Sequence, residues 1–202
     1  MSGDHYFSPE PSSPLTTRVK EISLRGRTIS VFTASGTFSP DGIDRGTEVL
    51  LKYAPPAPAE GTFLDIGCGW GPITLALALE SPGAQVWGVD VNERALATAR
   101  ANCEHLGIPN VRISTPDEVP TDLTFDLVWS NPPIRVGKAE LHAILERWLP
   151  RLSPGGEAWL VVAKKLGADS LQEWINNSLS GSFRCERAAT AAGFRVLRVR
   201  RT

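Results

Sequence analysis

The segment Phe63-Leu64-Asp65-Ile66-Gly67-Cys68-Gly69-Trp70-Gly71-Pro72 is the most informative part of this chain, because an apolar run passes through three glycines into a second apolar run. Glycine accepts backbone conformations that other residues avoid, so these glycines permit a sharp turn that brings backbone amides close to a ligand. We expect a strand over residues 62–66 and a helix over residues 72–80. Such a strand, turn and helix are typical of the nucleotide-binding end of an α/β domain.

Strands and helices alternate along the rest of the chain, and this alternation predicts the fold class. Further strands are expected over residues 85–89, 111–114, 125–130, 157–163, 183–188 and 194–199. Helices are expected over residues 92–106, 138–152 and 170–179. The spacing predicts an α/β, Rossmann-like fold with a mostly parallel seven-stranded sheet and helices on both faces.

The residues before position 60 follow a different pattern. Two strands, over residues 18–24 and 28–33, are separated by a turn at Gly26 and predict an N-terminal β-hairpin extension. A helix is expected over residues 45–53, and the three prolines among residues 54–59 prevent its continuation. Residues 1–17 are rich in Ser, Pro and Thr, which is typical of an extended arm.

Composition and charge exclude several classes of protein. The 202 residues are 42% hydrophobic and carry a net charge of −1, which excludes a strongly basic nucleic-acid coat protein but allows an enzyme with a local basic patch. Cys68, Cys103 and Cys185 are far apart, and the three histidines lack metal-ligand spacing, so we expect no disulfide framework and no metal. No signal peptide or membrane span is evident, and a reducing, cytoplasmic location is expected.

The spacing of the glycines distinguishes between two cofactors. A dinucleotide loop has the pattern G-x-G-x-x-G, but here the pattern is G-x-G-x-G and the third dinucleotide glycine would fall on Pro72. Asp65 precedes the loop, and a carboxylate there suits the cationic amine and sulfonium of S-adenosylmethionine (SAM) better than a pyrophosphate. Asp90 ends the next strand and can accept both ribose hydroxyls of either cofactor. We therefore expect SAM.

The expected cofactor contacts extend beyond the two aspartates. Asp117 follows the third strand, where a side chain can contact adenine, although a solvated loop carboxylate is the alternative. Asp90 could instead cap the next helix beside Asn92, and the glycine turn could serve without a ligand. The expected cofactor-binding residues are Asp65, Gly67, Cys68, Gly69, Gly71, Asp90, Val91, Asp117 and Asn131.

Asn131-Pro132-Pro133-Ile134 follows the expected strand at residues 125–130 and is the candidate catalytic tetrapeptide. The carboxyl ends of parallel strands lie at one edge of a sheet, so Asn131 should lie beside the glycine loop. The side-chain oxygen of Asn131 and the carbonyl of Pro132 can hold an NH₂ group with its nitrogen aimed at a sulfonium methyl, which is catalysis by orientation. A purely structural turn is the alternative.

These motifs together resemble the "methyltransferase small" family, which includes guanine-N2 methyltransferases of small-subunit ribosomal RNA and single-domain archaeal relatives. That resemblance implies methylation of an amide or exocyclic amino nitrogen, and it implies that Phe38 and Gly46-Thr47 line the cleft. We expect residues 1–60 to pack on a SAM-binding catalytic domain over residues 61–202 as one globular unit. The resemblance is carried by His5-Tyr6-Phe7-Ser8, Gly36-Thr37-Phe38-Ser39, Ile43-Asp44-Arg45-Gly46-Thr47, Asp65 to Gly71, Asp90, Asn131 to Ile134 and Gly137-Lys138.

The sequence departs from the family pattern at two points. Many Asn-Pro-Pro enzymes have an aromatic fourth residue that stacks on the substrate, whereas Ile134 offers only apolar contact, so Phe38 or Trp129 is expected to supply the ring. Bacterial two-domain relatives also carry an N-terminal duplicate domain, which is not expected in this sequence. Substrate recognition is then expected to use less surface.

An RNA substrate requires positive charge near the cleft. Arg45, Arg135 and Lys138 are the candidate contacts next to the site, with Phe38 as a further substrate residue. The leading hypothesis is methylation of guanine N2 in ribosomal RNA. A protein glutamine amide, a small molecule, and a SAM-binding scaffold without activity are the alternatives. Further basic residues lie outside the motifs, at Arg18, Lys20, Arg25, Arg27, Arg195, Arg198, Arg200 and Arg201.

Overall fold

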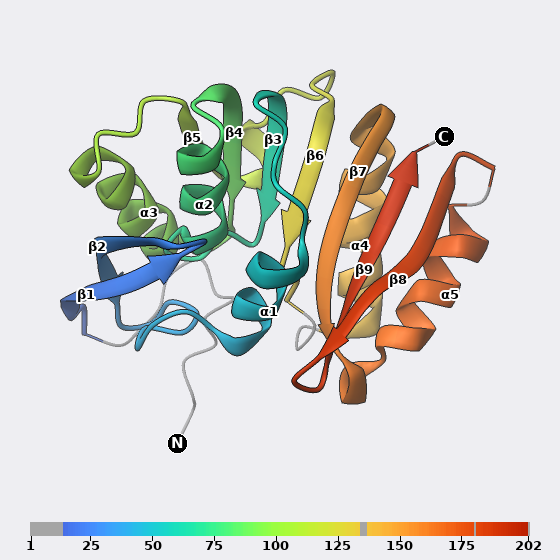
Figure 1. Ribbon diagram of the computed structural model, residues 1–202, viewed down its shortest axis with the longest axis horizontal. Coiled ribbons are helices and arrows are strands. Elements are labelled where there is room, and N and C mark those ends of the chain that lie inside the picture. Colours follow the sequence, from blue (N-terminus) through green and yellow to red (C-terminus); the bar gives the residue numbers. More distant parts are fainter. Residues whose placement is uncertain (1–13, 134–136, 180, 202) are drawn as a thin grey trace.

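The computed structural model describes residues 14–133, 137–179 and 181–201, and its centre is a seven-stranded sheet (Figure 1). The strand order is β5-β4-β3-β6-β7-β9-β8, and β9 alone runs antiparallel to its neighbours. The expected Rossmann-like, mostly parallel sheet is therefore confirmed. The strands are β3 (Glu60–Ile66), β4 (Gly83–Val89), β5 (Val111–Ser114), β6 (Phe125–Ser130), β7 (Leu152–Ala163), β8 (Phe183–Ala191) and β9 (Phe194–Arg201).

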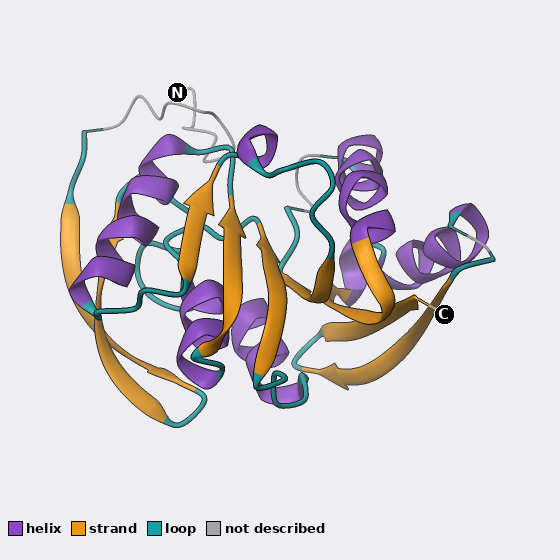
Figure 2. Ribbon diagram, turned by 90° about the horizontal axis from the view of Figure 1, so that it is seen from above, coloured by secondary structure: helices purple, strands orange, loops and turns teal. Residues whose placement is uncertain are grey.

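Helices cover both faces of this sheet because alternate residues of each central strand are apolar and point to opposite sides. On β3, Phe63 packs into the core beneath α1 and α2, whereas Leu64 packs into the core beneath α4 and α5. The view from above shows the helices above and below the strands (Figure 2). The helices are α1 (Arg45–Tyr53), α2 (Pro72–Glu80), α3 (Glu93–His105), α4 (Lys138–Trp148) and α5 (Ala168–Ser178).

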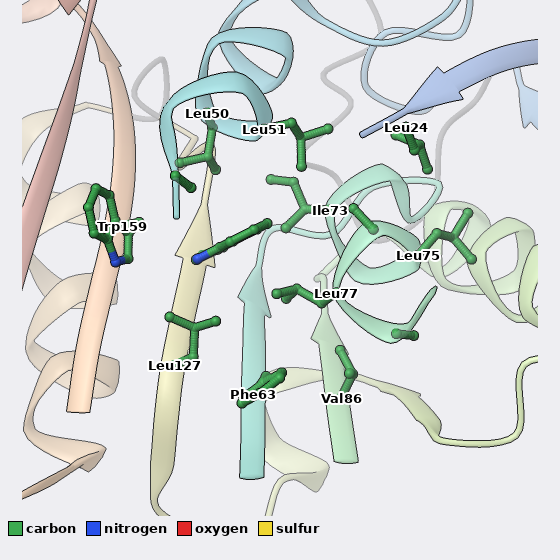
Figure 3. Close-up of a cluster of buried hydrophobic side chains, with 14 of the residues drawn as sticks. Leu24, Leu50, Leu51, Phe63, Ile73, Leu75, Leu77, Val86, Leu127 and Trp159 are labelled. Atoms are coloured by element: carbon green, nitrogen blue, oxygen red, sulfur yellow. The ribbon is translucent and has the colours of Figure 1, made fainter. Parts of the chain in front are cut away.

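The core on the α1 and α2 side joins the N-terminal segment to the sheet. Leu50 and Leu51 of α1 lie beside Ile73 of α2, and below them Phe63 and Leu127 project from the strands (Figure 3). Helix α2 is apolar nearly all round because it packs between the sheet, α1 and the hairpin. Burial of this many large side chains fixes the start of α2, and with it the glycine loop, against the sheet.

The N-terminal β-hairpin forms a separate two-stranded antiparallel sheet of β1 (Thr17–Leu24) and β2 (Arg27–Ala34). The turn residues Arg25 and Gly26 both have positive φ angles, as tight hairpins require. Asn102 of α3 ties the hairpin to the domain, because its Nδ2 donates to the carbonyls of Phe32 and Trp70 at 2.9 Å each. The expected hairpin extension is thus confirmed, and one buried amide joins it to the glycine loop.

The largest differences from the expected boundaries are at the end of α4 and the start of β7. Helix α4 ends at Trp148 rather than near residue 152, because Pro150 lacks an N–H and the chain forms a 3-10 turn over Leu149–Arg151. Strand β7 begins at Leu152 rather than at residue 157, and its pairing with β6 shifts register between Phe125 and Leu127. Gly155 has a φ of 78°, so the chain turns locally within a segment that still pairs as a strand.

Candidate functional site

A cavity of about 770 Å³ opens at the carboxyl ends of β3, β4 and β6, where the strand order reverses direction along the chain. This is where open α/β sheets bind ligands, and the volume is in the usual range for a cofactor site. Its walls come from the glycine loop, the end of β4, the Asn-Pro-Pro turn, α4 and the β7–β9 region. The residues that line the cavity include Phe38, Asp44, Gly67, Asp90, Val91, Pro116, Asn131, Pro132, Pro133, Lys165 and Phe194.

The glycine loop has the geometry that its composition predicts. Gly67, Gly69 and Gly71 have φ angles of 74°, 56° and 101°, a region that is costly for other residues. Its amides, however, are used within the protein. The N–H groups of Gly67 and Cys68 donate to the Val89 carbonyl at 2.9 Å each, and that of Gly69 donates to Asp90. These three amides therefore donate within the protein, and the loop orients Asp90.

Asp90 lies on the cavity wall and is held by two backbone amides. Its Oδ2 accepts from Gly69 N at 2.8 Å and its Oδ1 from Asn92 N at 2.9 Å. Burial raises the pKa of this carboxyl above its usual range, although both hydrogen bonds act in the opposite direction. The N-cap of α3 is Asn92, whose side chain accepts from Ala95 N, so Asp90 does not cap that helix. A carboxylate with spare lone pairs at this position can accept hydroxyl groups.

Asp65 lies beneath the glycine loop and not on the cavity wall. It is fully buried, and its Oδ2 accepts from Thr74 N at 2.9 Å and from Thr74 Oγ1 at 2.7 Å. Its Oδ1 is also buried but has no hydrogen-bond partner among the described residues. Burial raises the pKa of this carboxyl to about 7. A buried acceptor without a partner, next to Ile66 and Gly67 on the cavity wall, fits a cationic ligand better than a phosphate.

The structure does not bring Asp117 or Cys68 to the main cavity. Asp117 has a side chain that is 90% exposed and pairs with Arg147 at 2.8 Å, while the neighbouring Pro116 lines the wall. Cys68 is buried beside the loop, and this burial raises the pKa of its thiol. Val91, by contrast, is 46% exposed at the cavity, as a wall for a flat ring requires.

Asn131 lies beside the glycine loop because Ser130, the residue before it, pairs with Ile66 in the sheet and donates through Oγ to the Ile66 carbonyl at 2.7 Å. The Asn131 side chain reaches across to the first turn of α1. Its Nδ2 donates to Asp44 Oδ2 at 2.9 Å and to Thr47 Oγ1 at 3.1 Å. The amide nitrogen is thereby committed to the protein, which leaves the oxygen as the group that can accept from a ligand.

Only some of the remaining residues that were expected to contact the substrate line the cavity. Pro132, Pro133 and Phe38 line the cavity, whereas Ile134 and Arg135 lie outside the described residues. Arg45 and Lys138 are exposed at the N-termini of α1 and α4 and are not on the cavity wall.

The expectation that Trp129 stacks on the substrate was wrong, because its ring is buried beneath α1 with the Arg25 guanidinium 5.4 Å from its centre.

Sequence reasoning missed Phe194 and the role of Asp44. Phe194 begins β9 and lines the cavity, where its ring and the Asn131 amide both approach Gly46. No local motif marks Phe194, since only the antiparallel pairing of β9 with β7 brings it to the site. Asp44 could have been found, because an aspartate before the helix at residues 45–53 predicts an N-cap at the cleft.

The fold and the cavity define a Rossmann-like nucleotide-binding α/β protein with the architecture of a methyltransferase. The chain matches the family described as Methyltransferase small domain over residues 28–198, and it belongs to that family. Methyltransferases of this family use SAM as the methyl donor, so the expected class and cofactor are confirmed at the level of the family.

Relatives and solved structures agree with this assignment. The chain is 38% identical over 173 residues to the uncharacterized protein YbxB of Bacillus subtilis, covering 84% of this chain and 86% of that protein. It is 32% identical over 204 residues to ribosomal RNA small subunit methyltransferase C of Pseudomonas entomophila, covering 98% of this chain and 58% of that protein. The chain spans about half the length of the ribosomal RNA methyltransferases that it matches.

Two solved structures share the fold at lower identity. The T. thermophilus 16S rRNA N2 G1207 methyltransferase, solved with AdoMet and guanosine, has a TM-score of 0.74 at 22% identity and covers 96% of this chain and 52% of that one. A methyltransferase from Pyrococcus furiosus has a TM-score of 0.60 at 23% identity and covers 76% of this chain and 80% of that one.

Proposed function

We propose that this chain transfers the methyl group of SAM to the exocyclic N2 amino group of a guanine in small-subunit ribosomal RNA, in the cytoplasm. The observation that carries the proposal is the orientation of Asn131, whose amide nitrogen is bound by Asp44 and Thr47 while its oxygen remains available at the cavity. An acceptor fixed in this way selects a substrate that donates hydrogen bonds, which an amino group does. Relatives named as ribosomal RNA methyltransferases support RNA as the substrate.

The residues at the loop fit the charge of the cofactor. Asp90 presents a carboxylate at the cavity wall, and Asp65 lies buried beneath the loop with one oxygen unpaired. When bound, SAM supplies an electrophilic methyl group on a positively charged sulfur. In this proposal Asp90 accepts the ribose hydroxyls, and Val91 packs against the adenine. Because Gly67 has no side chain, the cofactor can approach the loop closely, and the Asp65 carboxylate offsets the positive charge of the cofactor from beneath the loop.

The Asn-Pro-Pro turn performs the chemistry by orientation. Asn131 Oδ1 and the Pro132 carbonyl accept the two hydrogens of the amino group, which points the nitrogen lone pair toward the methyl group. As the nitrogen–methyl bond forms and the sulfur–methyl bond breaks, the nitrogen gains positive charge, and both acceptors stabilise it. The proton then leaves the methylated nitrogen for solvent, so no strong base is needed beforehand.

Two rings and a cation on the cavity wall fit a flat, negatively charged substrate. Phe38, Phe194 and Lys165 all line the cavity, with Phe38 next to Gly69 of the loop. Base stacking on aromatic rings is a common way to hold an unpaired nucleotide, and lysine can contact its phosphate. Arg45 and Lys138 are exposed at helix N-termini outside the cavity, where we propose that they contact the surrounding RNA backbone. Ile134 and Arg135, which follow Pro133 in the sequence, are proposed to contact the substrate as well.

The test is methyl transfer from labelled SAM to small ribosomal subunits that lack the modification, followed by analysis of the digested nucleosides. We expect label in N2-methylguanosine, and we expect Asn131→Ala to reduce it at least about a hundredfold, as loss of an orienting hydrogen bond in a transition state does. Asn177→Ala is the matched control, because Asn177 is an exposed asparagine on α5 away from the cavity. Its activity should equal that of the wild type.

Other results would contradict either the proposed substrate or the proposed mechanism. Label in a protein glutamine or in a small molecule, with none in RNA, would contradict the ribosomal substrate while leaving the acceptor geometry in place. Equal labelling by wild type and Asn131→Ala would contradict the mechanism itself. Binding of SAM, measured by calorimetry in parallel, distinguishes an inactive preparation from a wrong substrate.

A further inference from the structure

The first turn of α1 forms a polar clamp on Asn131. Asp44 Oδ2 accepts from Asn131 Nδ2 at 2.9 Å and from the helix amide of Gly46 at 2.7 Å, so one oxygen both caps the helix and holds the asparagine. Thr47, which is buried, accepts from the same Nδ2 at 3.1 Å. The two N–H bonds of the Asn131 amide are thus both engaged. The clamp consists of Asp44 and Thr47, and it lies 84 to 87 residues before Asn131 in the chain.

The clamp permits only one orientation of the amide. An ionised carboxylate is an acceptor only, so the NH₂ end of Asn131 faces Asp44, and a flip by 180° would place two oxygens against each other. Hydrogen bonds in a chain also polarise one another, so donation to a carboxylate makes Asn131 Oδ1 a stronger acceptor. We propose that Asp44 and Thr47 are positioning residues that hold Asn131 with its oxygen toward the amino group to be methylated. This inference rests on the proposed function.

The packing around Gly46 shows how closely the clamp is built. A Cβ atom at position 46 would lie 2.9 Å from Asp44 Oδ2, 3.1 Å from Phe194 Cε1 and 3.2 Å from Asn131 Nδ2. These are shorter than comfortable contacts, so the helix reaches Asn131 only because residue 46 has no side chain. The Phe194 ring and the side-chain amide of Asn131 both lie close to Gly46 and therefore close to each other. The clamp therefore ties α1, the end of β6 and the start of β9 into one site.

The test compares pairs of substitutions that separate positioning from folding. Asp44→Ser keeps a good N-cap but is too short to reach Asn131, whereas Asp44→Asn keeps both the cap and an acceptor oxygen. Thr47→Val removes the second acceptor at constant shape, and Thr47→Ser restores it.

For Asp44→Ser we expect kcat to fall roughly ten- to a hundredfold, as for loss of a charge-assisted hydrogen bond, with the Kd of SAM within about twofold of wild type. Asp44→Asn, which restores the hydrogen bond but not the charge, should recover part of that loss, and Thr47→Ser should recover the smaller loss caused by Thr47→Val. The unfolding midpoint should stay constant across each pair. A fall in kcat that is matched by equal falls in SAM affinity and unfolding midpoint would overturn the proposal in favour of a merely structural role.

A double substitution gives a second kinetic test. If Asp44 acts through Asn131, Asp44→Ser should cost nothing further in an Asn131→Ala background. Additive losses would show that Asp44 acts independently and would overturn the inference.

A spectroscopic measurement keeps the inference testable even if ribosomal RNA is not the substrate. The side-chain amide of Asn131 in ¹⁵N-labelled protein should give two resolved proton resonances with slow exchange, and Asp44→Ser should speed that exchange at least about tenfold. Asn177 on α5 is the internal reference. Unchanged exchange in Asp44→Ser would overturn the clamp, whereas absence of RNA methylation with a protected Asn131 amide would count against the proposed substrate alone.

Discussion

Replacing Asp65 with asparagine should change how the stability of this protein depends on pH. Burial raises the pKa of Asp65 to about 7, whereas an aspartate in an unfolded chain has a pKa of about 3.9. Between these two values the folded chain binds more protons than the unfolded chain, so the free energy of unfolding falls as the pH rises. The contribution of protonated Asp65 to the free energy of unfolding is fully present below about pH 4 and is lost by about pH 7. This loss is at most about 4 kcal/mol.

Asparagine removes this titration but adds a constant cost. Its oxygen can accept both hydrogen bonds from Thr74, but its NH₂ group then occupies the buried position of Oδ1, which has no partner. An unpaired buried donor costs about 1–3 kcal/mol at every pH. Wild type should therefore be more stable than Asp65→Asn at pH 4 and less stable at pH 8.5. The two curves should cross between about pH 4.5 and 6, where the loss from titration equals this constant cost.

Urea denaturation of both proteins, in half-unit steps from pH 4 to 8.5, measures this crossing. Asp41→Asn is the matched control, because Asp41 has a side chain that is 80% exposed and forms only a surface ion pair with Arg18. Its curve should run parallel to that of the wild type. Parallel curves for wild type and Asp65→Asn would refute the burial argument. Calorimetry at pH 8 should in addition show SAM binding weakened at least about tenfold by Asp65→Asn, since the carboxylate is proposed to offset the cationic cofactor.

Three further perturbations test other parts of the structure. Phe194→Leu should raise the KM for RNA roughly tenfold in steady-state assays and leave the Kd of SAM unchanged, because one base stack is lost. Asn102→Leu should lower the free energy of unfolding by about 3 kcal/mol in urea titrations, since it leaves buried groups of Phe32 and Trp70 unpaired. Arg45→Gln should reduce the slope of log binding constant against log salt concentration for RNA by about one unit, without changing kcat. An unchanged slope would exclude a contact between Arg45 and a phosphate.

The sequence predicts the sheet well because its signal is local. Strands buried on both faces are short apolar runs bounded by glycine or proline, and β3, β4 and β6 all have this form. The expected helix at residues 138–152 was too long, because the apolar spacing continues through Leu149 while Pro150 ends the helix. The start of β7 was missed because Gly155 and Gly156 resemble a break, although the chain pairs with β6 on both sides of them.

The candidate site is predictable to the extent that it is made of consecutive residues. The glycine loop, Asp90 and Asn131 each follow a strand that the pattern identifies, so their meeting at one edge follows from topology. The rings and the clamp could not be predicted in the same way. Phe194 reaches the cavity through antiparallel pairing late in the chain, and Trp129 shares a strand face with Leu127, which already places it in the core.

The two halves of the site depend on different parts of the chain. In the proposed function, the cofactor half uses the loop after β3 and the end of β4, which pair with each other in the sheet. The proposed chemical half depends on Asp44, Thr47 and Phe38, which all precede β3. If the clamp orients Asn131, then residues 14–60 do more than cover the sheet. Loosening α1 would leave SAM binding in place and remove the orientation on which methyl transfer depends.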